Sequence, residues 1–171
     1  IDKYFGKAVA ERLEPPRVEG GLACPSQTVE EFYANLSDAL SGQQPVIYIL
    51  DSMDALSSEY EQTKTLERKE ALRKGLRAKG DYGDGKAKRN SSGIRSELAR
   101  LRDTGSILIV LNQTRANINA GPFEPAKTRS GGHALTFYAT SELWSSVGGQ
   151  IKKTVRGVPR TVGIQCKVRV K

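Results

Sequence analysis

The chain has 171 residues and a net charge of +8, with 37% hydrophobic and 27% charged residues. This length is enough to bury the core of one ordinary domain, and the composition is typical of a soluble α/β protein rather than a fibrous or membrane protein. No apolar run approaches the roughly 20 residues of a membrane helix, and no signal peptide is recognisable. Cys24 and Cys166 show no C-x-x-C or Cys/His spacing, so we expect free buried thiols in a reducing compartment and hence a cytoplasmic protein.

The first third of the chain predicts two helices and a buried strand. Residues 2–13 have a helical pattern, and apolar residues recur at helical spacing across Thr28–Leu40, with Gly42 just past the end. Residues Val46–Leu50 then form a short, continuous apolar run that ends in Asp51. This segment is therefore expected to be a helix followed by a buried strand.

A second apolar run, Ile107–Leu111, ends in Asn112 and Gln113. Runs that are apolar throughout are typical of parallel strands covered on both faces. A helical pattern over 92–102 separates the two runs, which makes a strand–helix–strand unit. The predicted fold class is therefore α/β, with a largely parallel sheet flanked by helices.

The last third predicts a long loop and then antiparallel strands. Residues 115–132 are polar and contain two prolines and three glycines, which is typical of a functional loop, and helical spacing resumes over 133–138. We expect three strands added to the C-terminal end of the sheet, at 141–147, 150–155 and 161–170, with turns at 148–149 and 157–159.

The excess positive charge is concentrated in one segment. Residues 63–102 hold 13 Lys and Arg against 5 Asp and Glu, whereas the remainder holds 14 of each. A charge run is often only a solvated face, but its concentration in an otherwise neutral chain favours a polyanionic partner. The tip of the segment, residues 80–89, is expected to be flexible.

Polar residues stand at the end of both apolar runs. Ligands of open α/β sheets bind beyond the carboxyl ends of the strands. An Asp at such an end can hold a magnesium-bound water beside nucleotide phosphates, although it can also simply cap the strand. Asp51 with Ser52 and Asn112 with Gln113 are therefore either nucleotide-binding residues or caps of their strands.

Three motifs resemble the RecA recombinase family over nearly the whole chain. Ile49–Leu56 looks like the family's Walker B strand, and Leu111–Arg115 looks like the strand leading into its second DNA-binding loop. Thr128–Ala139 resembles the end of that loop and the helix that follows. The resemblance implies a RecA-like P-loop ATPase core, of a bacterial or phage kind, with residues 1–171 forming a single partial domain.

The resemblance implies a nucleotide site with ATP and Mg²⁺ as cofactors. Asp51 would order magnesium through water, and Gln113 would sense the γ-phosphate and relay its presence to the following loop. These two are the predicted catalytic residues. The alternative role for Gln113 is a cap at the start of the loop.

The resemblance also implies binding of single-stranded and double-stranded DNA by two loops, within a homo-oligomeric helical filament. Backbone amides of glycines approach phosphates closely because no side chain intervenes. Phe123 would pack at the tip of the second loop, or alternatively anchor that loop to the core. The predicted DNA contacts are Lys86, Lys88, Arg89, Ser91, Arg95, Arg115, Phe123, Arg129, Gly131 and Gly132.

One departure from the family pattern matters for function. The sequence contains no G-x-x-x-x-G-K-[ST] motif, so the first strand, the Walker A loop, its helix and the catalytic Glu are expected outside this chain. The predicted function is the DNA-dependent ATPase core of a strand-exchange protein. The alternatives are a RecA-fold helicase or regulatory ATPase, and a non-catalytic basic DNA-binding module.

Overall fold

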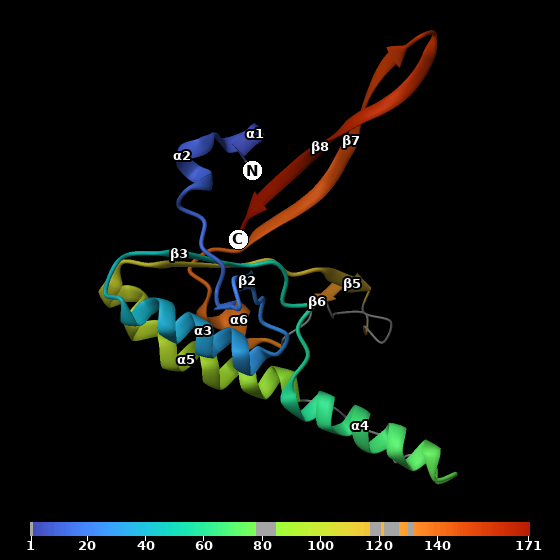
Figure 1. Cartoon of the computed structure of the whole chain (residues 1–171). Helices are drawn as coiled ribbons and strands as arrows, with labels where there is room; N and C mark the ends of the chain where they lie inside the picture. The colour runs from blue at the N-terminus through green and yellow to red at the C-terminus, as the bar shows by residue number, and fades with distance from the viewer. Residues whose placement is uncertain (1, 78–84, 117–120, 122–126, 130–131) are drawn as a thin grey trace. The chain divides into compact units, whose positions relative to one another are not determined.

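The computed structural model describes residues 2–77, 85–116, 121, 127–129 and 132–171, and the chain divides into two compact units, 1–135 and 136–171 (Figure 1). The helices are α1 Asp2–Phe5, α2 Lys7–Ala10, α3 Val29–Ser41, α4 Glu59–Arg73, α5 Gly85–Thr104 and α6 Ala134–Tyr138. The strands are β1 Val18–Glu19, β2 Leu22–Ala23, β3 Ile47–Leu50, β4 Ile107–Val110, β5 Thr114–Ala116, β6 Lys127–Arg129, β7 Leu143–Val155 and β8 Val158–Val170.

The centre of the first unit is a parallel pair of strands. β3 and β4 pair in register from Ile47 with Ile107 to Leu50 with Val110, with α4 and α5 between them in the chain. The predicted strand–helix–strand unit is confirmed. The molecule is a mixed α/β protein with one parallel and three antiparallel strand pairs among its described residues.

The core lies between α3, α5 and one face of this strand pair. Phe32 and Leu36 of α3 are fully buried, and Ile94 of α5 is also buried. The ring of Phe32 also contacts the ring of Tyr48 on β3, with centroids 5.9 Å apart. Thr28 caps α3 by accepting a hydrogen bond from the Glu31 backbone N–H at 3.1 Å, so the predicted helix and its start are confirmed.

The expectation that the strand pair is covered on both faces is wrong for the described residues. Alternate side chains of a strand point to opposite faces, and α3 and α5 lie along one face only (Figure 1). On the other face, Ile47 and Ile107 remain 64% and 53% exposed, and Ile49 and Ile109 are also exposed. The continuous apolar runs correctly predicted that both faces of the strands are apolar. Among the described residues, however, only one of these faces is packed against helices.

The basic segment is more helical than expected. The predicted helix at 92–102 begins two turns earlier, at Gly85, so residues 85–89 of the expected flexible tip are helical, while 80–84 lie outside the described residues. A second helix, α4, starts at a capping box in which Ser58 and Glu61 bond each other's backbone N–H groups. α4 buries none of its side chains and extends away from α3 and α5 (Figure 1).

The start of the chain is also less regular than predicted. The helix expected over 2–13 is split into α1 and α2, because Gly6 between them has a positive φ of 83°. β1 and β2 follow as a short antiparallel pair.

The second unit is a long antiparallel hairpin, with two strands instead of the predicted three. β7 and β8 form a sheet of their own, so they do not extend the parallel pair. Gly148 and Gly149 lie inside β7 next to a register shift, where a β-bulge absorbs the extra residue. The turn predicted at 157–159 is present one residue earlier, at Arg156–Gly157, both at positive φ, as a two-residue hairpin turn requires. Helix α6 confirms the helical pattern predicted at 133–138.

Both cysteines are free, as expected, but neither is fully buried. Cys24 is half-buried and Cys166, on β8, is exposed. Cys166 lies on a hairpin whose side chains are mostly exposed within the described structure, so its apolar surroundings in the sequence did not indicate burial.

Candidate nucleotide and DNA-binding site

The two predicted nucleotide-binding strand ends lie side by side. The Leu111 N–H donates to the Leu50 carbonyl at 2.9 Å, and the Met53 N–H donates to the Leu111 carbonyl at 3.0 Å. Asp51 and Gln113 therefore stand at the same edge of the parallel pair. Asp51 is exposed there, in a cis peptide bond with half-buried Ser52.

Asp54 connects these two strand ends. Its side chain is only 7% exposed, and its Oδ2 atom accepts the backbone N–H of Gln113 at 2.6 Å. Its Oδ1 atom accepts a hydrogen bond from Nη2 of Arg115, on β5, at 3.3 Å. Reasoning from the sequence missed Asp54, because only the contact across the sheet edge distinguishes it from a surface acid.

Lys86, at the start of α5, lies close to Asp54 and Arg115. Nζ of Lys86 donates to the Leu56 carbonyl at 2.6 Å. Burial lowers the pKa of Lys86; the carboxylates of Glu61 and Asp54 oppose this shift, and the Arg115 guanidinium adds to it. We refer to Asp54, Glu61, Lys86 and Arg115 as the strand-end charge cluster.

The end of the second predicted DNA-binding segment also reaches α5. A Cβ atom added at Gly132 would lie 2.8 Å from the Cβ of Ala87. Gly132 therefore packs directly beside the start of α5. The structure brings together three predicted DNA-binding residues from distant parts of the sequence, Lys86, Arg115 and Gly132.

The remaining predicted DNA contacts are distributed along α5 and the second loop. Lys88, Ser91 and Arg95 follow each other at helical spacing and share one face of α5, with Lys88 and Arg95 exposed. Arg95 donates from Nε to the Ser91 carbonyl at 2.9 Å, whereas Arg89 pairs through Nε with Glu30 at 3.1 Å.

Three second-loop residues are placed only in part. The Arg129 backbone pairs with Thr114 in the antiparallel β5–β6 pair. Phe123 and Gly131 lie outside the described residues, so their predicted roles remain predictions.

Asp51 is the one predicted metal-binding carboxylate at this sheet edge, and it is exposed. Mg²⁺ usually keeps several waters and takes one or two carboxylates plus phosphate oxygens, a role that the exposed Asp51 can fill. In the part of the chain that the structure describes, no three His, Cys, Asp or Glu side chains converge as a metal site. The sequence supplies no Walker A motif, so the phosphate contacts of Asp51 and Gln113 remain predictions.

A second basic surface was missed from the sequence. Residues 141–171 hold seven Lys and Arg and one acidic residue, whereas residues 1–62 hold four Lys and Arg and eleven acidic residues. These two imbalances cancel in the net charge outside residues 63–102, so the basic hairpin was not noticed. Strand alternation and register put four cations on one face of the hairpin: Lys153, Arg160, Lys167 and Arg169. Trp144 lies on this face too, with Nζ of Lys171 4.3 Å from its ring centroid.

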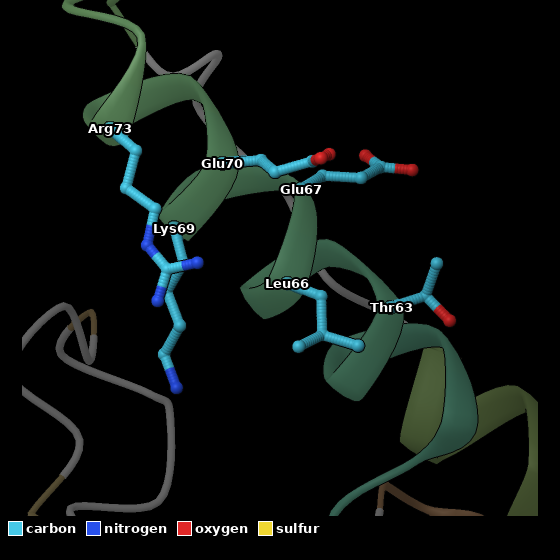
Figure 2. A pocket seen from close by; sticks show the side chains of 6 residues that line it. All are labelled: Thr63, Leu66, Glu67, Lys69, Glu70 and Arg73. Atoms are coloured by element: carbon cyan, nitrogen blue, oxygen red, sulfur yellow. The ribbon is translucent and has the colours of Figure 1, made fainter.

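Helix α4 carries shallow surface hollows rather than a built site. One is lined by six described residues, all from α4 (Figure 2). Lys69 and Arg73 project together with Leu66 from one side of the helix, and Glu67 and Glu70 project from another (Figure 2). These side chains form a solvated helix surface, and no pair of them is arranged for acid–base or metal chemistry.

No helix in the described ranges has the length and apolar character needed to cross a membrane. No protein-family model matches the sequence.

Proposed function

We propose that this chain belongs to the DNA-dependent ATPase core of a RecA-type strand-exchange protein, which binds single-stranded DNA and acts with ATP and Mg²⁺. The observation that carries the proposal is the meeting of Gln113 with both predicted DNA-binding segments at one sheet edge. Asp54 joins the Gln113 backbone to Arg115 on β5, and the same cluster includes Lys86 at the start of α5.

On the nucleotide side, the proposal assigns two roles. Asp51 orders a magnesium-bound water through its negative charge, which its exposed position at the end of β3 permits. Gln113 senses the terminal phosphate from the end of the neighbouring strand. Bound Mg²⁺ and ATP supply the phosphoryl chemistry, and this chain's residues orient water and report occupancy.

On the DNA side, the proposal assigns phosphate contacts to α5 and the segments near it. The face of α5 that carries Lys88, Ser91 and Arg95 offers charged and hydroxyl groups, which suit phosphate oxygens without reading sequence, and the Gly132 backbone N–H is assigned a further phosphate contact. The basic face of the β7–β8 hairpin adds a second positive surface that suits DNA phosphates.

A second candidate function is a basic DNA-binding module without nucleotide chemistry. The absence of a G-x-x-x-x-G-K-[ST] motif from this sequence favours it. In that case Asp51 and Gln113 are only strand-end caps, and Mg²⁺–ATP has no effect on DNA binding.

Binding of a labelled single-stranded oligonucleotide, measured against salt, tests the proposal. Log affinity is expected to fall linearly with log salt, with a slope of about −0.7 per phosphate contact. Arg95→Gln should reduce the slope by about one contact. Arg102→Gln is the matched control, because Arg102 is exposed on the last turn of the same helix and pairs with Asp103 at 2.8 Å. Salt-independent binding, or no binding, would contradict the DNA half of the proposal.

A further inference from the structure

We propose that Asp54 is a positioning residue that couples the nucleotide-sensing strand end to DNA binding by holding both Gln113 and Arg115. This inference rests on the proposed function. One carboxylate oxygen fixes the backbone at Gln113, between β4 and β5, and the other oxygen holds the Arg115 guanidinium, which a DNA phosphate can bind instead.

The two contacts differ in strength. The bond to the Gln113 N–H is short, at 2.6 Å, and is made by a carboxylate that is almost completely buried. Charge-assisted bonds of this kind are about twice as strong as neutral ones. The Gln113 contact is therefore the fixed part of the arrangement.

The Arg115 contact is the exchangeable part. The Arg115 side chain is 65% exposed and its Nη2 atom lies 3.3 Å from Oδ1. Because the Arg115 side chain is mostly exposed, water and salt screen its end of the pair, and a phosphate that offers two oxygens to the guanidinium can compete with Asp54 for it. Arg115 is thus held near the sheet edge until a phosphate binds it.

Lys86, in the same strand-end charge cluster, does not simply replace Arg115 on the Asp54 carboxylate. To do so it would have to break its hydrogen bond to the Leu56 carbonyl. When a phosphate takes Arg115, Asp54 retains its bond to the Gln113 N–H. Occupation of the DNA site thereby changes the electrostatic surroundings of the residue proposed to sense the γ-phosphate, and the reverse follows because linkage is reciprocal.

Asp54→Asn tests the inference in the 171-residue chain, because Asn keeps an oxygen for the Gln113 N–H and removes the charge that holds Arg115. Single-stranded DNA affinity at low salt should rise about three- to tenfold, and the salt slope should steepen by about 0.7, equal to one contact. The gain should vanish in Asp54→Asn/Arg115→Gln, which should bind like Arg115→Gln alone.

The matched control is Asp103→Asn, which also removes an acid paired with an exposed Arg, at 2.8 Å. It lies 17 residues after Lys86 on α5, or about 25 Å along the helix axis. Its DNA affinity should change less than twofold. An equal gain in Asp103→Asn, or a gain that survives in the double variant, would overturn the inference and leave DNA binding itself intact.

If Asp54→Asn does not fold, NMR of the wild-type chain tests the same inference. NMR of the Arg115 guanidinium and of the Gln113 amide, with and without the oligonucleotide, should show the guanidinium signal shift while the Gln113 amide stays protected from exchange. DNA binding with an unchanged Arg115 signal would overturn the inference alone. No DNA binding by the wild-type chain would overturn the proposed function and the inference together.

Discussion

Gly132 packs against Ala87, so the end of the second predicted DNA-binding segment rests on the first turn of α5. The contact joins residues 45 positions apart in the sequence, and it depends on the absence of a side chain, since an added Cβ would come within 2.8 Å of the Ala87 Cβ. Gly132 also has a φ of +77°, a conformation that favours glycine.

Gly132→Ala is therefore expected to weaken single-stranded DNA binding several-fold, by displacing the segment from α5. The control is Gly75→Ala, because Gly75 has a similar φ of +67° but nothing within 4 Å of an added Cβ. Both variants carry backbone strain of about 1–2 kcal/mol, so only the loss beyond that of Gly75→Ala reports the contact. Equal DNA affinities of the two variants would contradict this prediction.

Gly93→Ala is expected to destabilise the first unit. A Cβ at Gly93 would collide with the ring of Tyr33, a side chain so buried against α5 that burial raises its pKa. Overpacking of this kind costs about 1–3 kcal/mol, more than the helix propensity that Ala gains over Gly. Urea unfolding measures the change, and exposed Ser92→Ala on the same helix should stay within about 0.5 kcal/mol of wild type.

Lys153→Glu is expected to stabilise the hairpin while weakening its interaction with DNA. Lys153 lies directly opposite Arg160 in the β7–β8 register, and like charges at such positions repel by about 0.2–1 kcal/mol. Lys152→Glu is the control, since Lys152 lies opposite Thr161 and makes the same change of charge. Thermal unfolding should separate the two variants; equal midpoints would show that the Lys153–Arg160 pair has no energetic cost.

Asp51→Asn should leave stability within about 0.5 kcal/mol of wild type, because Asp51 is exposed and Asn is nearly isosteric. In the full product of the gene, the same change should lower magnesium-dependent ATP turnover about 10- to 100-fold, as expected when a group that orders metal-bound water is lost. Asp103→Asn serves as the control. A stability loss without a turnover loss would support the strand-end cap. The 171-residue chain itself is expected not to turn over ATP, since its sequence has no phosphate cradle.

The elements that the sequence predicted well are those whose signals are local. The helix capped at Thr28 and the two apolar runs were found because period and cap lie within about a dozen residues. The juxtaposition of Asp51 with Gln113 was also predictable, since parallel strands end at the same edge.

The misses have physical causes as well. The capping box at Ser58 was a usable signal for α4, but the charge of the residues that follow was interpreted only as a binding surface. Gly148 and Gly149 suggested a turn, but they lie inside β7 beside a register shift. The hairpin turns at Arg156 and Gly157, which both have a positive φ. Asp54 could not be found from the sequence, because its importance comes from Gln113 and Arg115, about 60 residues away.

DNA strand exchange by the full product of the gene, with ATP and Mg²⁺, distinguishes the three candidate functions. We predict that the protein pairs a single strand with a homologous duplex and displaces the resident strand. Asp54→Asn should alter the DNA concentration that this requires, whereas Asp103→Asn should not. ATP-driven unwinding of a duplex without pairing of homologous strands would instead assign the protein to the helicase alternative. DNA binding that is indifferent to ATP, with no exchange, would leave only the basic DNA-binding module.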